Sequence, residues 1–398
     1  MANQLHVPKL PSTVNQVTRT PQESHPEDPM TQPTPLCNRR TFLAALAAAG
    51  AAALTRNAQA TTSAPADRLK LGFDNFSVRA FDWKAPQLIE YAASLKVDTL
   101  LLSDLDVYES LEADYLKQLA ARAKEAGVEL QAGTGSICPT SKSYNEKKWG
   151  KAEDHARLLI RTARLLGTPV ARCYLGSQQD RRGDGGIDRH MDAMVKVLET
   201  VRSEAEDAGV KIAVENHAGD MLAWELVDLI KEAGESFVGA TMDPGNAAWA
   251  IEDPMVNLEA LGPYVVTTGI RDTAVWETEQ GAKAMWANMG HGNTDWPAYV
   301  NRFRELCPDV PFVLEIISYK WLGESNYLEP EFWSRYPQAR AGEFARYVAL
   351  ARRGKEYTIP AGRPAGDPSP QLEQAQQKFD LEESLKYCRE TLGIGVKG

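Results

Sequence analysis

One ten-residue stretch, KIAVENHAGD at Lys211–Asp220, constrains the fold of this chain more than any other part of it. An apolar run at Ile212–Val214 leads directly into the polar triplet Glu215-Asn216-His217. A continuous apolar run of this length is typical of a strand that is buried on both faces of a parallel sheet. A carboxylate, an amide and an imidazole at the end of such a strand indicate that the strand end opens into a site.

Three later segments repeat this pattern of an apolar run that stops at a charged residue. The segments are Val238–Met242 before Asp243, Val265–Ile270 before Arg271-Asp272, and Phe312–Leu314 before Glu315. Four successive strands are therefore expected to deliver a charged group at their carboxyl ends. This is the end of a (β/α)8 barrel at which active sites are found.

The number and order of the expected elements also favour a single (β/α)8 TIM barrel over residues 69–353. Eight strand–helix pairs fit between Leu69–Phe73, the first expected strand, and Ala341–Arg353, the helix expected to close the cycle. The eighth strand is expected at Pro311–Ile317, and the long segment Asp272–Thr294 is expected as a loop. A doubly wound open sheet is the competing fold, but no G-x-G-x-x-G fingerprint follows the first strand.

Residues 1–60 have the features of a processing segment rather than of a folded domain. A stretch rich in Pro, Gln and Thr is followed by Arg39-Arg40, an Ala-rich run and the small-residue pattern Ala58-Gln59-Ala60. This order resembles a disordered n-region with a twin-arginine signal peptide. We therefore expect export through the Tat pathway, to the periplasm or otherwise out of the cytoplasm. A membrane anchor is the alternative, although Ala44–Leu54 is too short to span a bilayer stably.

Two further segments flank the expected barrel. Residues 61–68 form a short linker, and residues 354–398 form a tail rich in Pro and Gln. A short helix is expected in this tail at Leu381–Thr391. The tail either wraps the barrel or reaches a partner, and the sequence leaves an oligomer open.

The composition excludes several classes of function. A formal net charge of −10 argues against a nucleic-acid surface, which normally needs a basic patch. The five cysteines include no C-x-x-C pair, so neither a zinc ribbon nor a disulfide framework is indicated. The mature chain offers no stable membrane span. The partner that we expect is a small molecule, a sugar or an oxidised glycoside, on the grounds of the site residues described below.

Three carboxylates should meet at the mouth of the barrel, namely Glu215, Asp243 and Glu315. Clustered carboxylates repel one another, so keeping all three ionised needs a cation or shifted pKa values. Oxygen ligands with one imidazole suit Mn²⁺ best, with Mg²⁺, Co²⁺ or Zn²⁺ as further choices. The alternative is that separate ion pairs form with the barrel arginines Arg172 and Arg271.

A divalent ion of this kind suits chemistry next to a carbonyl group. When a hydroxy-ketone chelates the ion, the carbonyl is polarised and the adjacent C–H becomes more acidic. Two carboxylates beside that carbon can then remove a proton and return one, which produces epimerisation or isomerisation. Glu215 and Glu315 are the residues that we expect to form this acid/base pair.

Other polar and aromatic side chains near the expected strand ends and loops are predicted to bind substrate. They are His217, Asn216, Asn246, Arg271, Arg172, Lys142 and Trp249. Each has a structural alternative, since an imidazole can support the fold, Asn246 can cap the following helix and a Trp can simply pack. The loops that contain Lys142 and Trp286 are expected to roof the pocket and to set its specificity.

These motifs together resemble the xylose isomerase-like TIM barrels, the sugar phosphate isomerase/epimerase superfamily. The resemblance covers residues 69–353 and rests on V-E-N-H at 214–217, M-D-P-G-N at 242–246, I-R-D at 270–272, M-G-H-G-N at 289–293 and L-E-I at 314–316. Members of that family bind a divalent metal through a Glu, an Asp, a His and a second Glu on strands five to eight. The resemblance implies these roles for Glu215, Asp243 and Glu315, with the two Glu residues also acting as the acid/base pair.

The seventh strand departs from the family pattern. The family commonly has H-x-[KR]-D there, and this chain has Gly269 two residues before Arg271-Asp272. The fourth ligand is thus missing from its usual place, and His291 is the expected substitute. The resemblance also implies a second reaction, in which deprotonation of a 3-keto-glycoside leads to β-elimination.

Two alternatives to an isomerase or epimerase remain open at this point. The first is a carbohydrate-binding barrel that has lost catalysis together with the fourth ligand. The second is an endonuclease of the apurinic-site type, which shares this barrel but needs a multi-zinc cluster with several histidines. The chain after the expected signal contains only four, His155, His190, His217 and His291.

Overall fold

The computed structural model describes residues 68–319 and 321–395. The predicted export segment, residues 1–60, and almost all of the predicted linker lie outside these residues. Within the described part of the chain, no helix has both the length and the apolar character needed to cross a membrane. The four cysteines of this part, Cys138, Cys173, Cys307 and Cys388, are all free and buried.

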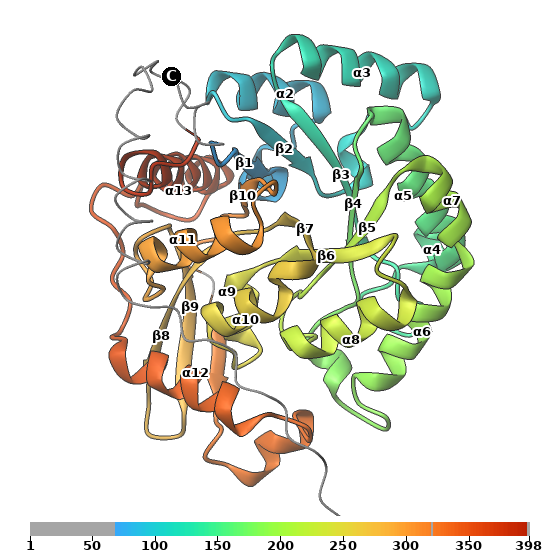
Figure 1. Ribbon diagram of the computed structural model, residues 1–398. Helices are drawn as coiled ribbons and strands as arrows, with labels where there is room; N and C mark the ends of the chain where they lie inside the picture. The colour runs from blue at the N-terminus through green and yellow to red at the C-terminus, as the bar shows by residue number, and fades with distance from the viewer. Residues whose placement is uncertain (1–67, 320, 396–398) are drawn as a thin grey trace, which may run out of the picture. The chain divides into compact units, whose positions relative to one another are not determined.

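Eight parallel strands form the barrel that the sequence predicts, in the order β10-β1-β2-β3-β4-β5-β6-β7 (Figure 1). The strands are β1 (Leu71–Asp74), β2 (Thr99–Leu102), β3 (Glu129–Ser136), β4 (Val170–Tyr174), β5 (Lys211–Glu215), β6 (Val238–Met242), β7 (Val265–Thr268) and β10 (Phe312–Leu314). The barrel closes just after β7, where Ile270 pairs with Leu314. There, the Ile270 amide donates to the Val313 carbonyl at 2.7 Å and the Glu315 amide to the Ile270 carbonyl at 2.9 Å.

Helices surround the barrel and pack apolar side chains against it, which removes these side chains from water. The helices that follow the first seven barrel strands are α2 (Ala85–Ser94), α3 (Ala113–Glu125), α5 (Ala152–Leu166), α6 (Asp188–Thr200), α7 (Arg202–Ala208), α8 (Ala223–Ala233), α10 (Pro254–Leu261) and α11 (Trp296–Leu306). Short elements lie in the loops: α4 (Glu146–Trp149), α9 (Pro244–Trp249), η1 (Asn75–Phe81), η2 (Leu105–Val107), η3 (Gln178–Arg181), η4 (Gly262–Tyr264) and η5 (Pro330–Arg335).

The segment after β7 was expected as a loop and is instead a β-hairpin. Strands β8 (Asp272–Glu277) and β9 (Ala282–Ala287) pair antiparallel, and β11 (Trp321–Ser325) adds to β9. Their apolar residues form a second buried cluster beside the barrel core, which includes Val275 and Ala284. The hairpin was missed because the helix that covers it begins more than fifty residues after the end of β9.

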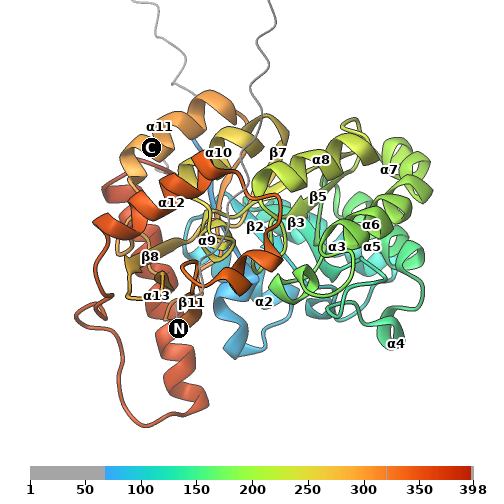
Figure 2. The ribbon, with the colours of Figure 1, turned by 90° about the horizontal axis from the view of Figure 1, so that it is seen from below.

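That helix is α12 (Ala341–Arg353), which we expected to close the barrel. The expectation was wrong, because its buried side chains Tyr347, Leu350 and Ala351 belong to the cluster of the small sheet. Figures 1 and 2 show α12 alongside β8 rather than against β1 and β10. The first α-helix after the last barrel strand therefore covers the small sheet and not the barrel.

The C-terminal helix α13 (Pro370–Glu390) covers the barrel beside β1 and β10 instead. It is longer than the expected helix at Leu381–Thr391. Its side chains Leu381 and Leu385 join the core of the barrel. Polar contacts tie it to η1 and α2, since Gln377 Oε1 accepts from the Ala80 amide at 2.8 Å and Arg389 donates to the Leu95 carbonyl at 2.6 Å. Figure 2 shows α13 on the same side of the barrel as α11.

Candidate functional site

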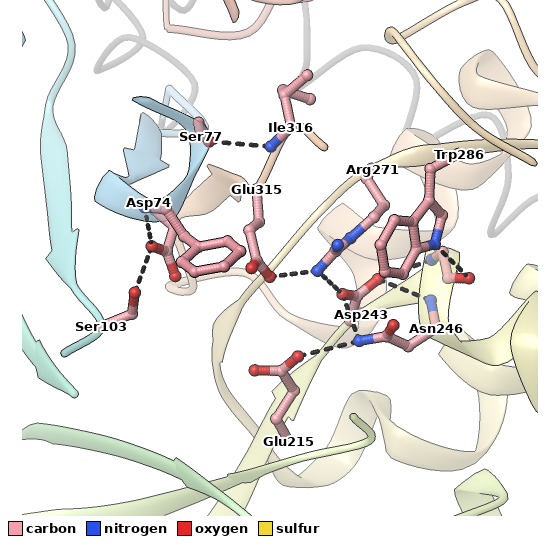
Figure 3. Close-up of polar contacts among 12 residues, drawn as sticks. Asp74, Ser77, Ser103, Glu215, Asp243, Asn246, Arg271, Trp286, Glu315 and Ile316 are labelled. Carbon is pink, nitrogen blue, oxygen red and sulfur yellow. Dashed lines mark hydrogen bonds and ion pairs between the residues drawn. The ribbon is translucent and has the colours of Figure 1, made fainter. Parts of the chain in front are cut away.

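The structure brings Glu215, Asp243 and Glu315 together at the carboxyl ends of three barrel strands. Glu215 is the last residue of β5, Asp243 follows β6, and Glu315 follows β10. All three are buried, and one carboxylate oxygen of each lies within 4.8 Å of the other two. Figure 3 shows the three side chains converging from different strands. Within the described residues, this is the one group of acidic, Cys or His side chains close enough to hold a metal ion.

Arg172 on β4 is the partner of Glu215. Its Nε donates to Glu215 Oε2 at 2.6 Å, its Nη2 contacts the same oxygen, and its Nη1 donates to the Thr134 carbonyl at 3.1 Å. Burial lowers the pKa of the Arg172 guanidinium, but the surrounding carboxylates outweigh this effect and raise it. Arg172 is therefore a permanent cation. Two of its nitrogens contact Glu215, and the third donates to the Thr134 carbonyl.

Arg271 is the partner of the other two carboxylates. Its Nη2 donates both to Asp243 Oδ2 and to Glu315 Oε2, so this nitrogen lies between them (Figure 3). The guanidinium carbon lies 4.3 Å from the ring centroid of Trp286, a cation–π contact. Nε and Nη1 of Arg271 are buried and have no hydrogen-bond partner. The clustering and the arginine pairing, which were alternatives in the sequence, thus occur together.

Two asparagines fix the geometry of Asp243. The side chain of Asn216 donates to the Asp243 carbonyl at 2.7 Å and accepts from the Asp243 amide at 2.9 Å. Asn246 Nδ2 donates to Asp243 Oδ2 at 2.7 Å and to Glu215 Oε1 at 3.0 Å. Asp243 Oδ1 caps helix α9 through the amides of Gly245 and Asn246. Asn216 was expected to bind substrate, and both of its polar atoms form hydrogen bonds with the backbone of Asp243.

A fourth carboxyl group, Asp74 at the end of β1, was missed as a site residue. It accepts from Ser103 Oγ at 2.5 Å and from the Phe76 amide at 2.8 Å. Burial and the nearby charge of Glu315 raise the pKa of Asp74 to about 7. Its place directly after an apolar strand was the sequence signal that could have identified it.

Negative charge exceeds positive charge in this cluster. Four carboxyl groups, Asp74, Glu215, Asp243 and Glu315, face the guanidinium groups of Arg172 and Arg271, and the charge of Arg79 also acts on Glu315. Burial, reinforced by the charges of Glu215 and Glu315 but opposed by Arg271, raises the pKa of Asp243 to about 8. The site therefore favours an added positive charge or bound protons.

His217 lies beside the cluster as a neutral imidazole. Its ring stacks on Tyr174 with the centroids 3.8 Å apart, and its Nδ1 lies 2.7 Å from the Gly176 carbonyl oxygen. Because a carbonyl can only accept, Nδ1 carries the proton and Nε2 is left as an acceptor. Burial and the neighbouring Arg172 lower the pKa of His217 to about 4. The imidazole is thus suited to accept a hydrogen bond from a hydroxyl group.

The structure does not bring three of the predicted residues to the carboxylates. His291 is exposed on the turn after β9, because Asp272 holds the amides of Gly290 and Gly292 and so fixes the direction of that turn. Lys142 is exposed, and Trp249 packs edge-on against Trp286 at 5.4 Å between centroids. The expected substitution of His291 for the missing ligand is therefore not seen, and Trp286 is the indole in contact with the cluster.

The donor set of the cluster fits a divalent cation. It offers three buried carboxylates at suitable spacing, and the buried amide oxygen of Asn246 has no hydrogen-bond partner. Hard oxygen ligands of this kind suit Mn²⁺ or Mg²⁺. Such an ion fits only if the guanidinium of Arg271 moves, since its Nη2 lies between Asp243 and Glu315.

Comparison with known proteins identifies a curated relative, similar solved structures and a matching protein family. The chain is 24% identical over 281 residues to a 3-oxo-isoapionate decarboxylase of Pectobacterium atrosepticum, which covers 65% of this chain and 91% of the relative. Its fold is similar to that of a D-psicose 3-epimerase solved with D-fructose, at 16% identity and a TM-score of 0.53, over 82% of this chain and 100% of that one.

A protein called IOLI, solved with a bound zinc atom, matches at 16% identity and a TM-score of 0.47, over 71% of this chain and 95% of that one. The model of a protein family described as the xylose isomerase-like TIM barrel matches residues 88–337, which is more than half of the chain. The chain belongs to this family, that of the xylose isomerase-like TIM barrels.

Proposed function

We propose that this protein is an enzyme that moves a proton next to the carbonyl group of a sugar or an oxidised sugar. The observation that carries the proposal is the pair of buried glutamates, Glu215 and Glu315, whose carboxylate oxygens lie within 4.8 Å of each other at one barrel mouth. Each is paired with a guanidinium: Glu215 with Arg172, and Glu315 with Arg271, which also contacts Asp243. Isomerisation or epimerisation is the reaction class.

The residues around the pair suggest how a substrate would be held. One glutamate removes the proton from the carbon next to the carbonyl, and the other returns a proton to the opposite face or to the neighbouring carbon. Nε2 of His217 accepts a hydrogen bond from a substrate hydroxyl. Asn246, which touches Glu215, and Asn216, which fixes Asp243, keep the carboxylates in position.

A divalent ion is part of this proposal, with Mn²⁺ first and Mg²⁺, Co²⁺ or Zn²⁺ as further choices. Glu215, Asp243 and Glu315 would hold it. When bound, such an ion acts as a Lewis acid that polarises the substrate carbonyl.

A lyase or decarboxylase reaction would use the same residues. Loss of CO₂ from a 3-oxo acid leaves an enolate, just as deprotonation next to a ketone does. The relative from Pectobacterium atrosepticum is named as a decarboxylase of a 3-oxo compound. The enolate left by decarboxylation takes one proton from a glutamate. In a 3-keto-glycoside, one glutamate removes the proton next to the ketone, the resulting enolate expels the alkoxide at its β-carbon, and the other glutamate protonates that alkoxide.

Solvent exchange tests the proposal directly. The protein is incubated with ketoses, 3-keto-glycosides and 3-oxo sugar acids in D₂O with Mn²⁺, and deuterium incorporation is followed by NMR. We expect exchange with the unchanged protein and its loss in Glu215→Gln and Glu315→Gln, with the exposed Glu259→Gln as the matched control. Sugar binding without exchange would contradict an enzyme and support the carbohydrate-binding barrel, which the missing histidine at Gly269 favours.

Export is a separate part of the proposal. The twin-arginine pattern at Arg39-Arg40 supports passage through the Tat pathway, to the periplasm or otherwise out of the cytoplasm. Fractionation of cells that express the full chain, beside an Arg39→Lys/Arg40→Lys variant, tests this. Equal retention of both proteins in the cytoplasm would contradict it.

A further inference from the structure

One nitrogen atom holds the central position of the carboxylate cluster. We propose that the guanidinium of Arg271 is a resident cation, which occupies the place between Asp243 and Glu315 where a divalent ion would bind. The unchanged protein is thereby stable without a metal, and it binds a divalent ion only by displacing this guanidinium. The inference concerns cation binding alone and does not depend on which substrate the enzyme uses.

The residue at position 269 leaves room for this guanidinium. A Cβ atom on Gly269 would lie 3.4 Å from Glu315 Oε2 and 3.7 Å from Asp243 Oδ2. These are ordinary contacts, but a longer side chain that continued in the direction of this Cβ atom would approach both carboxylates. The nitrogen of Arg271 already lies there. A metal-binding imidazole at position 269 and the observed position of Arg271 therefore exclude one another.

A second glycine makes room for the stem of the arginine. A Cβ atom on Gly245 would lie 2.1 Å from Cγ and 2.8 Å from Cδ of Arg271, which is closer than real atoms approach. The Gly245 carbonyl accepts from Trp286 Nε1 at 3.2 Å, and the indole of Trp286 in turn stacks on the guanidinium. Gly245, Gly269 and Trp286 thus shape one slot that fits an arginine in this conformation.

The hydrogen bonding of Arg271 in this slot is nevertheless incomplete. Its Nε and Nη1 are buried without a hydrogen-bond partner, and each buried unpaired donor costs about 1–3 kcal/mol. A side chain that is bound through one nitrogen only is easier to displace than one bound through all three. This is the reason to expect weak metal binding rather than none.

The test compares cation affinity and stability in the full chain after metal has been removed with a chelator. Mn²⁺ is titrated by calorimetry, and thermal unfolding is followed with and without Mn²⁺. In Arg271→Met we expect Mn²⁺ to bind at least about tenfold more tightly than in the unchanged protein, since 1.4 kcal/mol of lost competition already gives that factor. We also expect this variant to lose stability without Mn²⁺ and to regain it with Mn²⁺.

The controls distinguish this role from a simple loss of charge. Arg172→Met also removes a buried cation but leaves the slot filled, so it should not tighten Mn²⁺ binding to the same extent. If Arg271→Met does not fold, Gly245→Ala, which forces the arginine out of its slot, takes its place in the titration.

Two results would overturn the proposal. The first is one equivalent of tightly bound metal in the unchanged protein together with no gain in affinity in the variant. The second is Mn²⁺ binding that weakens when Arg271 is displaced. Because neither measurement uses a substrate, a failure here is separate from a failure of the proposed proton transfer.

Discussion

Two arginines at the same barrel mouth neutralise the same carboxylate cluster in different ways. Arg172 bonds to Glu215 and to a backbone carbonyl through all three of its nitrogens. Arg271 bridges Asp243 and Glu315 through one nitrogen and leaves two donors unpaired. Both guanidinium groups are buried, so solvent does not make up for the difference.

This difference divides the barrel mouth into two parts. We call the part with Arg172 and Glu215 the fixed half, and the part with Arg271, Asp243 and Glu315 the adaptable half. On the β4–β5 side the guanidinium of Arg172 and the carboxylate of Glu215 are fully paired, so this side is neutralised without a bound ion. On the side of β6, β7 and β10 the unpaired donors of Arg271 and the unpaired oxygen of Asn246 are both buried. Unsatisfied buried groups are uncommon in folded proteins and often mark a place where a ligand or ion binds. We therefore place the cation exchange on this second side.

The largest expected effect is on activity, and it compares the two glutamates. Glu215→Gln removes the base of the fixed half, and Glu315→Gln removes the base of the adaptable half. Because general acid–base catalysis contributes about 10²–10⁴-fold, each change should reduce turnover by that factor. Steady-state rates together with deuterium exchange measure it. A large loss in only one variant would show that one half performs the chemistry alone.

The next effect is on stability and compares the two arginines. Arg172→Met leaves Glu215 buried without its partner, which should cost about 3–5 kcal/mol of unfolding free energy. Arg271→Met should cost less, because it also removes two buried unpaired donors. Denaturant unfolding in the absence of metal gives both values, with the exposed Lys70→Met as a control. A larger loss in Arg271→Met would reverse the assignment of the two halves.

A smaller effect tests the slot around Arg271 through its two glycines. Gly245→Ala should destabilise the protein by about 1–3 kcal/mol, because the new methyl group overlaps the stem of the arginine. Gly269→Ala should change stability by less than about 1 kcal/mol, since its methyl group meets only ordinary contacts. Equal values from the same unfolding experiment would show that the slot is not shaped for the arginine.

The last prediction concerns the pH dependence of the unfolding free energy, which changes only gradually with each pH unit and arises at Asp74. Its pKa is raised to about 7 in the folded protein from an ordinary value near 3.8, so the folded state holds a proton that the unfolded state has lost. Between pH 4 and 7 this group's contribution to stability should therefore decline as pH rises, by at most about 1.4 kcal/mol per pH unit.

The difference in unfolding free energy between the unchanged protein and Asp74→Asn isolates this contribution. It should fall from pH 4 to pH 7 and then level off. If this difference in unfolding free energy does not change with pH, the pKa of Asp74 is not raised in the folded state, which contradicts the prediction.

Local patterns in the sequence determined the barrel and the place of its site. Apolar runs that stop at Glu215, Asp243 and Glu315 marked three strand ends, and parallel strands that close into a barrel must bring such ends together. Because this argument needs only the order of residues along each strand, it predicted the carboxylate cluster without any knowledge of packing.

Only the tertiary structure decided which helix covers the barrel. Helix α12 carries a clear apolar face, whereas α13 buries both apolar and polar side chains, so local patterns favoured α12 as the cover of the barrel. The hairpin β8–β9 needs a cover of its own and takes α12, which leaves α13 for the barrel. Two helices that are distant in the sequence can compete for one surface, and the spacing of apolar residues within each helix does not show which of them will cover it.

The pairing of charges was also settled only in three dimensions. Arg172 and Arg271 were recognisable as barrel residues, but the sequence could not say which carboxylate each would meet or which nitrogens would stay unpaired. These outcomes depend on the space left by Gly245 and Gly269 and on the stacking of Trp286. A strand end is fixed by residues adjacent in the chain, whereas an ion pair is fixed by side chains that meet from separate strands.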